Sequence, residues 1–117
     1  MFGLKEKHID AINQVFTHFQ GIEQVIVYGS RAKDNYRNGS DIDLTIVGEI
    51  EYADLMKLEN ELDDLLLPYK IDLSIKSKIN HPELIEHIER VGKTFYHRAA
   101  QAVLNEPPLE YKKAEDK

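Results

Sequence analysis

The spacing of apolar residues along the chain predicts three helices. Between residues 5 and 19 apolar side chains recur every three or four positions, which predicts an amphipathic helix closed by Gly21. A third helix is predicted from Pro82, which suits the first turn of a helix, to Gly92. Between these two lies a leucine-rich helix that stops near Pro68, and its apolar positions are Leu55, Leu58, Leu62, Leu65 and Leu66.

Four short segments have the pattern of β-strands. Residues 25–28 are β-branched and aromatic, and residues 40–47 and 70–75 alternate between apolar and polar side chains. Residues 94–97 could add a short edge strand. The order α-β-β-α-β-α-β predicts an α/β (α+β) fold: a mixed sheet of about four strands with helices packed on it, most simply all on one face. The connection through the second helix could make two strands parallel.

The second predicted strand carries two aspartates on its polar face. Asp41 and Asp43 are two residues apart, so their side chains leave the strand on the same side. At a separation of about 6 Å and an effective dielectric of about 20, two carboxylates repel by roughly 3 kcal/mol, which a cation or a proton can relieve. Oxygen ligands of this kind suit Mg²⁺ or Mn²⁺. Asp72 on the third strand would join them if the strands are neighbours, and three carboxylates could hold two ions.

A Gly-Ser pair directly after the first predicted strand suggests a phosphate site. Gly29 permits close approach of the backbone to a phosphate, and the Ser30 hydroxyl can donate to it. A short helix beginning at Ser30 would add free N–H groups and the positive end of its dipole. Arg31, Lys33 and Arg37 are within reach as charged phosphate contacts, although the sequence does not indicate which of them points inward.

Each of these features also has an ordinary explanation. Gly-Ser is a common turn, and an Asp-x-Asp pair on a strand is more often a solvated face. Their occurrence together in this order is far more specific than either alone, and it favours a metal-dependent nucleotide site. The five histidines show no metal-ligand spacing, and the acidic stretch in the second helix reads as a solvated surface.

Composition and charge limit the partners of this site. The 117 residues are 42% hydrophobic and 31% charged, which is typical of one soluble globular domain. A net charge of −6 is unlike a protein that follows a nucleic-acid backbone, so we do not expect nucleic acid as the direct substrate. The absence of cysteine and of an apolar run long enough for a membrane predicts a cytoplasmic protein. We expect residues 1–98 to form the domain and residues 99–117 a flexible or partner-docking tail.

These motifs resemble a known family. Over about residues 22–97 the chain is similar to the minimal nucleotidyltransferase (MNT) branch of the superfamily that includes DNA polymerase beta. The family's two motifs and its later aspartate are matched by Gly29-Ser30-Arg31-Ala32, Ser40-Asp41-Ile42-Asp43-Leu44 and Asp72. The chain departs from many members at Lys33-Asp34, where they continue with a basic residue and a glycine.

The resemblance implies a polymerase beta palm-like fold and Mg²⁺-dependent transfer of AMP from ATP. It implies that Asp41 and Asp43 bind the metal ions and that Asp72 contributes to the metal site and orients or deprotonates the acceptor hydroxyl. Nucleotide binding is assigned to Gly29, Ser30, Arg31 and Ser40. It also implies an MntA-type antitoxin that forms a hetero-oligomer with a small helical HEPN-domain toxin and adenylylates a tyrosine of that toxin.

Two other classes remain open. A nucleotidyltransferase of the antibiotic-modifying kind uses the same motif, usually with an extra domain, and would label a small molecule. A non-catalytic antitoxin would bind its partner with nucleotide at most as a ligand. It would still neutralise that partner without Asp41 and Asp43.

Overall fold

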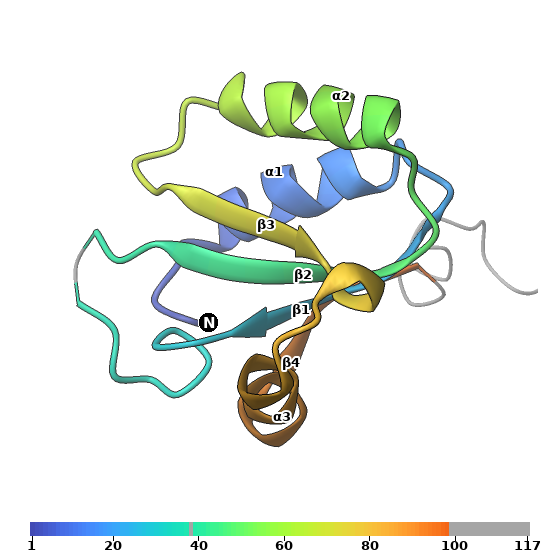
Figure 1. Ribbon diagram of the computed structural model, residues 1–117. Coiled ribbons are helices and arrows are strands. Elements are labelled where there is room, and N and C mark those ends of the chain that lie inside the picture. The colour runs from blue at the N-terminus through green and yellow to red at the C-terminus, as the bar shows by residue number, and fades with distance from the viewer. Residues whose placement is uncertain (38, 99–117) are drawn as a thin grey trace, which may run out of the picture.

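The computed structural model describes residues 1–37 and 39–98 (Figure 1). It confirms the predicted order of elements and the mixed α+β fold. Three helices and four strands follow one another, with a short 3-10 helix after the third strand. They are α1 (Glu6–Phe16), β1 (Ile22–Tyr28), β2 (Ile42–Gly48), α2 (Tyr52–Asp63), β3 (Ile71–Ile75), η1 (Lys76–Lys78), α3 (Pro82–Val91) and β4 (Lys93–His97).

Two boundaries differ from the sequence-based prediction. Helix α1 ends at Phe16, three residues early, because a turn closed by the Ile22 N–H donating to the Phe19 carbonyl (3.0 Å) leads the chain into the sheet. Helix α2 ends at Asp63, so Leu66 lies beyond the helix rather than on its buried face. The predicted 99–117 tail lies outside the described residues.

The four strands form one sheet in the order β3-β2-β1-β4 (Figure 1). Strand β1 is antiparallel to both β2 and β4, whereas β2 and β3 are parallel and joined through α2. This confirms the expected mixed sheet and the expected parallel pair. It also leaves β3 at one edge of the sheet, with β2 as its neighbour on one side.

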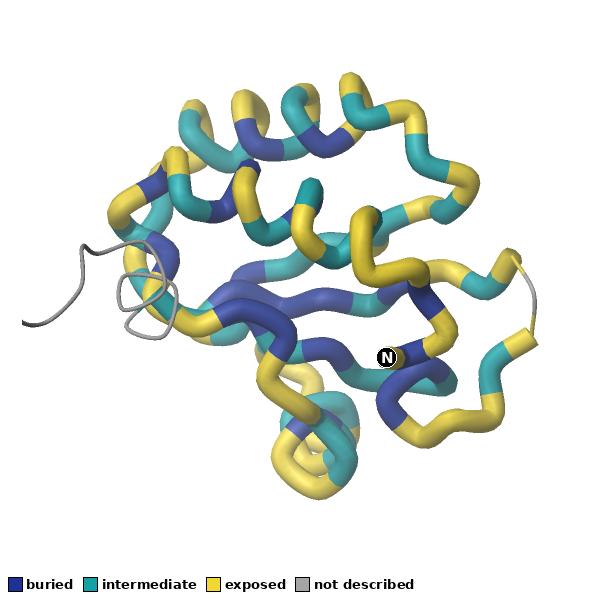
Figure 2. Tube along the Cα trace, turned by 180° about the vertical axis from the view of Figure 1, so that it is seen from behind, coloured by how far each residue is buried: buried dark blue, intermediate teal, exposed yellow. Residues whose placement is uncertain are grey.

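The main apolar core lies between the sheet and the layer formed by α1 and α2 (Figures 1 and 2). Alternate residues of the two central strands point into it and are completely buried: Val25, Val27, Leu44 and Ile46. Period-two burial on the strands and an apolar stripe on the helices therefore build the same core. No helix in residues 1–37 and 39–98 is both long and apolar enough to cross a membrane.

Helix α3 lies on the opposite face of the sheet, so the expectation that all helices share one face is wrong (Figure 1). A Cβ on Gly92, at the end of α3, would lie 2.7 Å from Cγ2 of Ile26 on β1, which shows how closely they pack. The chain moves one way across the sheet from β2 to β3 and back the other way from β3 to β4. The strands of each pair point the same way, so right-handed connections put α2 and α3 on opposite faces.

Candidate active site

Three side chains form a row across neighbouring strands on the face that carries α3. Tyr28 is paired with Asp43 in the ladder between β1 and β2, and Asp43 is paired with Asp72 in the ladder between β2 and β3. Neighbouring strands lie about 4.8 Å apart, so paired residues present their side chains side by side. The condition under which Asp72 would join Asp43, namely that the second and third strands are neighbours, is therefore met.

Asp43 is the carboxyl group at the centre of this row. Its burial beside the sheet raises the pKa of the Asp43 carboxyl, and the charges of Asp72 and Asp41 raise it further. His87 on α3 acts in the opposite direction. Asp43 is half-buried while Asp41 and Asp72 are exposed. The site thus concentrates negative charge at one partly desolvated position, which is what a cation-binding site requires.

We expect Asp43→Asn to stabilise the fold near neutral pH. Because the pKa of Asp43 is higher in the folded than in the unfolded chain, its ionisation favours unfolding, and stability falls as pH rises through the folded pKa. Without metal, the variant should therefore have a higher Tm than wild type at pH 7, and the difference should vanish near pH 3. Thermal unfolding followed by circular dichroism at the two pH values measures both. An equal or lower Tm of the variant at pH 7 would contradict the conclusion that the ionised Asp43 carboxylate destabilises the folded protein.

Gly29 makes room for the Asp43 carboxylate. Its φ of +78° is in the left-handed region, and an added Cβ would lie 2.4 Å from Oδ2 of Asp43. A side chain at position 29 would therefore displace the carboxylate. Gly29, which was predicted to let a phosphate approach the backbone, thus also leaves the space that the Asp43 carboxylate occupies.

The short helix expected at Ser30 does not form. The Lys33 N–H donates to the Gly29 carbonyl (3.2 Å) and the Asn35 N–H to the Ser30 carbonyl (3.1 Å), so the segment is a single turn. Asp34, at φ +65°, adopts the left-handed conformation that ends such turns. Asp34 is part of the departure from the family pattern noted above, and it occupies a position where glycine is favoured.

Arg31 is buried rather than directed at a ligand. Only 2% of its surface is exposed. Its guanidinium donates to the Phe2 carbonyl (Nη1, 2.9 Å) and to the Ser40 carbonyl (Nη2, 2.9 Å; Nε, 3.2 Å). It lies over the rings of Tyr36 (5.1 Å) and Tyr69 (5.2 Å). Arg31 therefore joins the N-terminus, the linker and the loop before β3, which argues against the predicted phosphate contact.

We expect Arg31→Lys to lower the free energy of unfolding by about 2 kcal/mol, because lysine cannot reproduce the bidentate fork and would leave buried carbonyls unpaired. Urea unfolding of the variant, with the exposed Arg37→Lys as control, measures this. Unchanged stability together with weaker ATP binding would instead restore the phosphate role.

Ser40 also has a local structural role. Its Oγ accepts the Arg37 N–H (2.8 Å), and its own N–H donates to the Arg37 carbonyl (2.9 Å). These bonds close the linker directly before Asp41. Of the residues predicted to bind nucleotide, Gly29 and Ser30 thus lie at the turn beside Asp43, whereas Arg31 and Ser40 hold the linker in place.

Tyr28 and His87 belong to the site but were not singled out from the sequence. Their rings meet edge to face with centroids 6.2 Å apart, which places α3 over the end of the row. Burial raises the pKa of the Tyr28 phenol; the Ser74 hydroxyl opposes this, while the charges of Asp43 and Asp72 add to it. Tyr28 precedes Gly29 at the strand end, a position that could have signalled it. His87 could not be found without the placement of α3.

The carboxylates offer part of a metal site. In the described part of the chain, no three His, Cys, Asp or Glu side chains are placed so that they could hold a metal ion by themselves. The expected three-carboxylate site is thus not met by these side-chain positions alone. However, Mg²⁺ is usually held by one or two carboxylates together with phosphate oxygens and water. Asp43 and Asp72 side by side, with an unfavourable negative charge at Asp43, fit that chemistry.

A mixed sheet with aspartates paired on neighbouring strands beside a Gly-Ser turn is the arrangement expected from the resemblance to nucleotidyltransferases. Residues 10–101 match the family described as polymerase beta, nucleotidyltransferase, and the chain belongs to this family of enzymes. Two proteins of Methanocaldococcus jannaschii, each described as a "Putative protein adenylyltransferase", are 36% identical to the chain over 70 residues, which is 58% of the chain and 70% of each relative.

Solved structures confirm the fold. One is described as a toxin-antitoxin with AMP-PNP; it superposes with a TM-score of 0.61 at 17% identity and covers 86% of this chain and 80% of its own. Another is described as a tri-AMPylated Shewanella oneidensis HEPN toxin in complex with MNT antitoxin, with a TM-score of 0.59 at 14% identity and coverage of 86% and 79%. At these identities the likeness concerns the fold.

Proposed function

We propose that this protein transfers AMP from ATP to a hydroxyl group of another protein, namely a tyrosine of a helical HEPN-domain toxin, and so acts as its antitoxin. The observation that carries the proposal is the register of Asp43 with Asp72 on the face of the sheet opposite α1 and α2. This register puts two carboxylates next to each other beside the Gly29-Ser30 turn. Phosphoryl-transfer sites use such carboxylates to hold a divalent cation with the substrate phosphates.

The relatives support the same chemistry. The two archaeal proteins carry the name of protein adenylyltransferases at 36% identity. Of the described complexes, one is a toxin-antitoxin with AMP-PNP, and the other holds a tri-AMPylated HEPN toxin together with an MNT antitoxin. We carry the acceptor class over to this chain on that basis. The net charge of −6 further favours a nucleotide carried with a cation over a nucleic-acid strand.

Asp41, Asp43 and Asp72, together with phosphate oxygens and water, would hold the metal, Mg²⁺ in two-ion form or Mn²⁺ in its place. When bound, the metal supplies positive charge for the triphosphate and for the leaving pyrophosphate. Gly29 and Ser30 would hold phosphate oxygens through the backbone and the hydroxyl. The raised pKa of Asp43 supports a role in metal binding. Burial and the neighbouring carboxylates disfavour the charged form of Asp43, and a bound cation would favour it.

In the proposed step the acceptor hydroxyl oxygen bonds to the α-phosphorus of ATP while the bond from that phosphorus to the bridging oxygen breaks. Pyrophosphate leaves and AMP remains on the acceptor. Asp72 is the exposed carboxylate at the sheet edge, so it is the group that an acceptor from another protein can reach. It orients the hydroxyl and accepts its proton.

The direct test is transfer of label from α-labelled ATP with Mg²⁺ in a cell extract that contains the candidate HEPN protein. We expect one labelled protein band, with the label located on tyrosine by mass spectrometry. Label on a small molecule instead would establish an antibiotic-modifying type of enzyme. No label from a folded protein that still suppresses the toxin would establish a non-catalytic antitoxin. Either result would overturn the proposal.

A further inference from the structure

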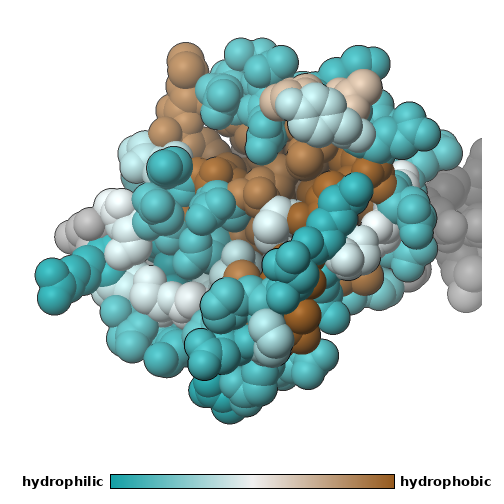
Figure 3. Space-filling model, viewed as in Figure 1, coloured by the Kyte–Doolittle hydropathy of each residue, from teal (hydrophilic) through white to brown (hydrophobic). Residues whose placement is uncertain are grey.

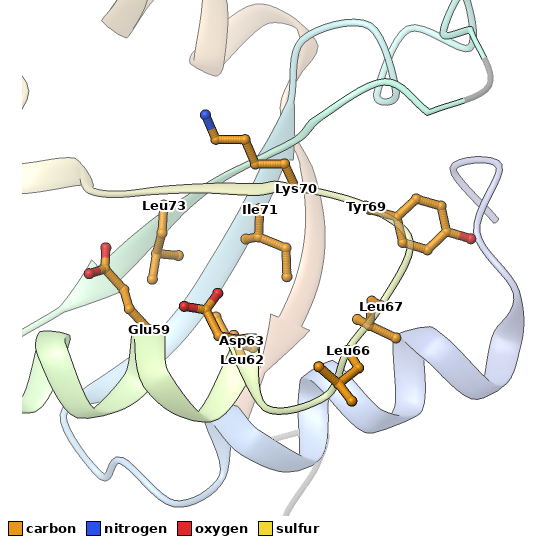
Figure 4. A pocket seen from close by; sticks show the side chains of 9 residues that line it. All are labelled: Glu59, Leu62, Asp63, Leu66, Leu67, Tyr69, Lys70, Ile71 and Leu73. Atoms are coloured by element: carbon orange, nitrogen blue, oxygen red, sulfur yellow. The ribbon is translucent and has the colours of Figure 1, made fainter.

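An open groove of about 440 Å³, lined by both apolar and charged side chains, lies between α2 and the edge strand β3 (Figure 4). The side chains of Ile71 and Leu73 extend from β3 toward α2, and Leu62 faces them from the helix. Figure 3 shows apolar side chains gathered in the hollow between these two elements. The groove is on the α2 side of β3, whereas Asp72 belongs to the opposite side.

The groove lies beside the free edge of the sheet, which is formed by β3. In the part of the chain that the structure describes, β3 has a neighbouring strand on one side only. The Ile42 N–H donates to the Lys70 carbonyl (2.8 Å). By the alternation of a parallel ladder, the backbone groups of Ile71, Leu73 and Ile75 then point to the open edge. A strand added there would find hydrogen-bonding groups along its length and an apolar space under alternate side chains.

Three exposed apolar side chains lie on α2 or directly after it, and one of them, Leu66, lines this groove. Leu66, at its end, is 87% exposed and holds a left-handed φ of +55°. Tyr52 (76% exposed) and Met56 (37%) lie on α2 itself. Of the large apolar residues exposed in residues 1–37 and 39–98, only Met1 lies elsewhere. Exposed apolar side chains on the element that borders an open strand edge favour a protein interaction surface.

Charge decides which partner fits. Glu59 and Asp63 rise from α2 into the groove wall, and Lys70 is the one basic residue that lines it. Pairing of β3 with β3 of a second copy would bring two such acidic walls together in a chain of net charge −6. A partner segment with lysine or arginine would instead meet opposite charge.

We propose that an extended, basic segment of a second protein adds to the free edge of β3 as a fifth strand. Its alternate apolar side chains fill the groove, and a basic side chain faces Glu59 and Asp63. The residues between them point to the Asp72 face. If the proposed function holds, the residue that pairs with Asp72 carries the acceptor hydroxyl to the carboxylates.

The test uses random twelve-residue peptides displayed on phage and selected on the full chain. The best peptide is then synthesised and added to ¹⁵N-labelled protein for NMR. We expect selected peptides with alternating apolar residues and at least one lysine or arginine. Their main shift changes should fall on the Ile71, Leu73 and Ile75 amides. Methylating alternate peptide amides in the register that faces β3 should weaken binding at least tenfold, whereas the other register should tolerate it.

The double variant Glu59→Lys with Asp63→Lys should also weaken peptide binding at least tenfold. Glu6→Lys with Asp10→Lys is the matched control, because it makes the same charge change at the same spacing on an exposed helix face. No enriched peptide, acidic peptides, shift changes elsewhere, or equal binding by both double variants would each overturn the proposal. Binding is measured without ATP and repeated with Asp43→Asn, so a failure of AMP transfer does not alter this result.

Discussion

Asp43→Asn should lower nucleotidyl transfer by at least about a thousandfold while the protein stays folded. Asp43 is the half-buried member of the carboxylate row, in contact with the space that Gly29 leaves open and in register with Asp72. The amide keeps the size of the side chain but removes the charge that a metal and its triphosphate require. A thousandfold loss corresponds to about 4 kcal/mol of transition-state stabilisation, within the range that metal and electrostatic effects supply.

Initial rates of label transfer from α-labelled ATP measure this loss, with circular dichroism to confirm the fold. Asp10→Asn is the matched control, because it removes an exposed carboxylate on α1, away from the row, and should transfer at the wild-type rate. Loss of less than about tenfold in Asp43→Asn would remove Asp43 from the catalytic machinery, and with it the central assignment of the site.

Gly29→Ala should lower transfer by about a hundredfold through displacement of Asp43. The added Cβ would lie 2.4 Å from Oδ2 of Asp43, so the carboxylate must move, and a misplacement of about 1 Å at a reacting centre can cost about a hundredfold. The left-handed φ of +78° adds a backbone cost of about 1–2 kcal/mol in stability.

Gly39→Ala separates these two effects. Gly39 has almost the same φ, +81°, but a Cβ there would meet nothing within 4 Å. The two variants should therefore lose similar stability in urea unfolding, while Gly39→Ala keeps near wild-type transfer. If both lose transfer equally, backbone strain and not the position of Asp43 explains the effect of Gly29→Ala.

The elements that the sequence predicted best are those whose burial has a simple period. Alternation along residues 40–47 predicted both the buried aliphatic face and the polar face with Asp43, and the structure confirms both. The Gly-Ser pair follows the first strand as predicted, but the segment forms a turn and not the expected short helix. The adjacency of Asp72 and Asp43 was only conditional, because a sequence pattern does not state which strands are neighbours.

Directions in space could not be predicted from the sequence. Arg31 was assigned to nucleotide binding with no indication of where it points, and its guanidinium donates to the carbonyls of Phe2, in the N-terminal segment, and of Ser40, in the linker before β2. A charged residue in a motif does not reveal whether backbone carbonyls from elsewhere will surround it. Helix α3 was expected beside the other helices, but strand order and the handedness of connections place it on the opposite face.

The sequence by itself determined the order of elements, the buried face of each strand and the chemistry of the motif residues, because these depend on local periodicity and residue type. The tertiary structure decided which residues meet. The register of Tyr28, Asp43 and Asp72, the contact of His87 with Tyr28 and the groove beside β3 all depend on strand order and on the helix layers. These features are contacts between residues far apart in the sequence. The free energy of such contacts is gained only when the distant segments pack together, so a local sequence pattern does not reveal them.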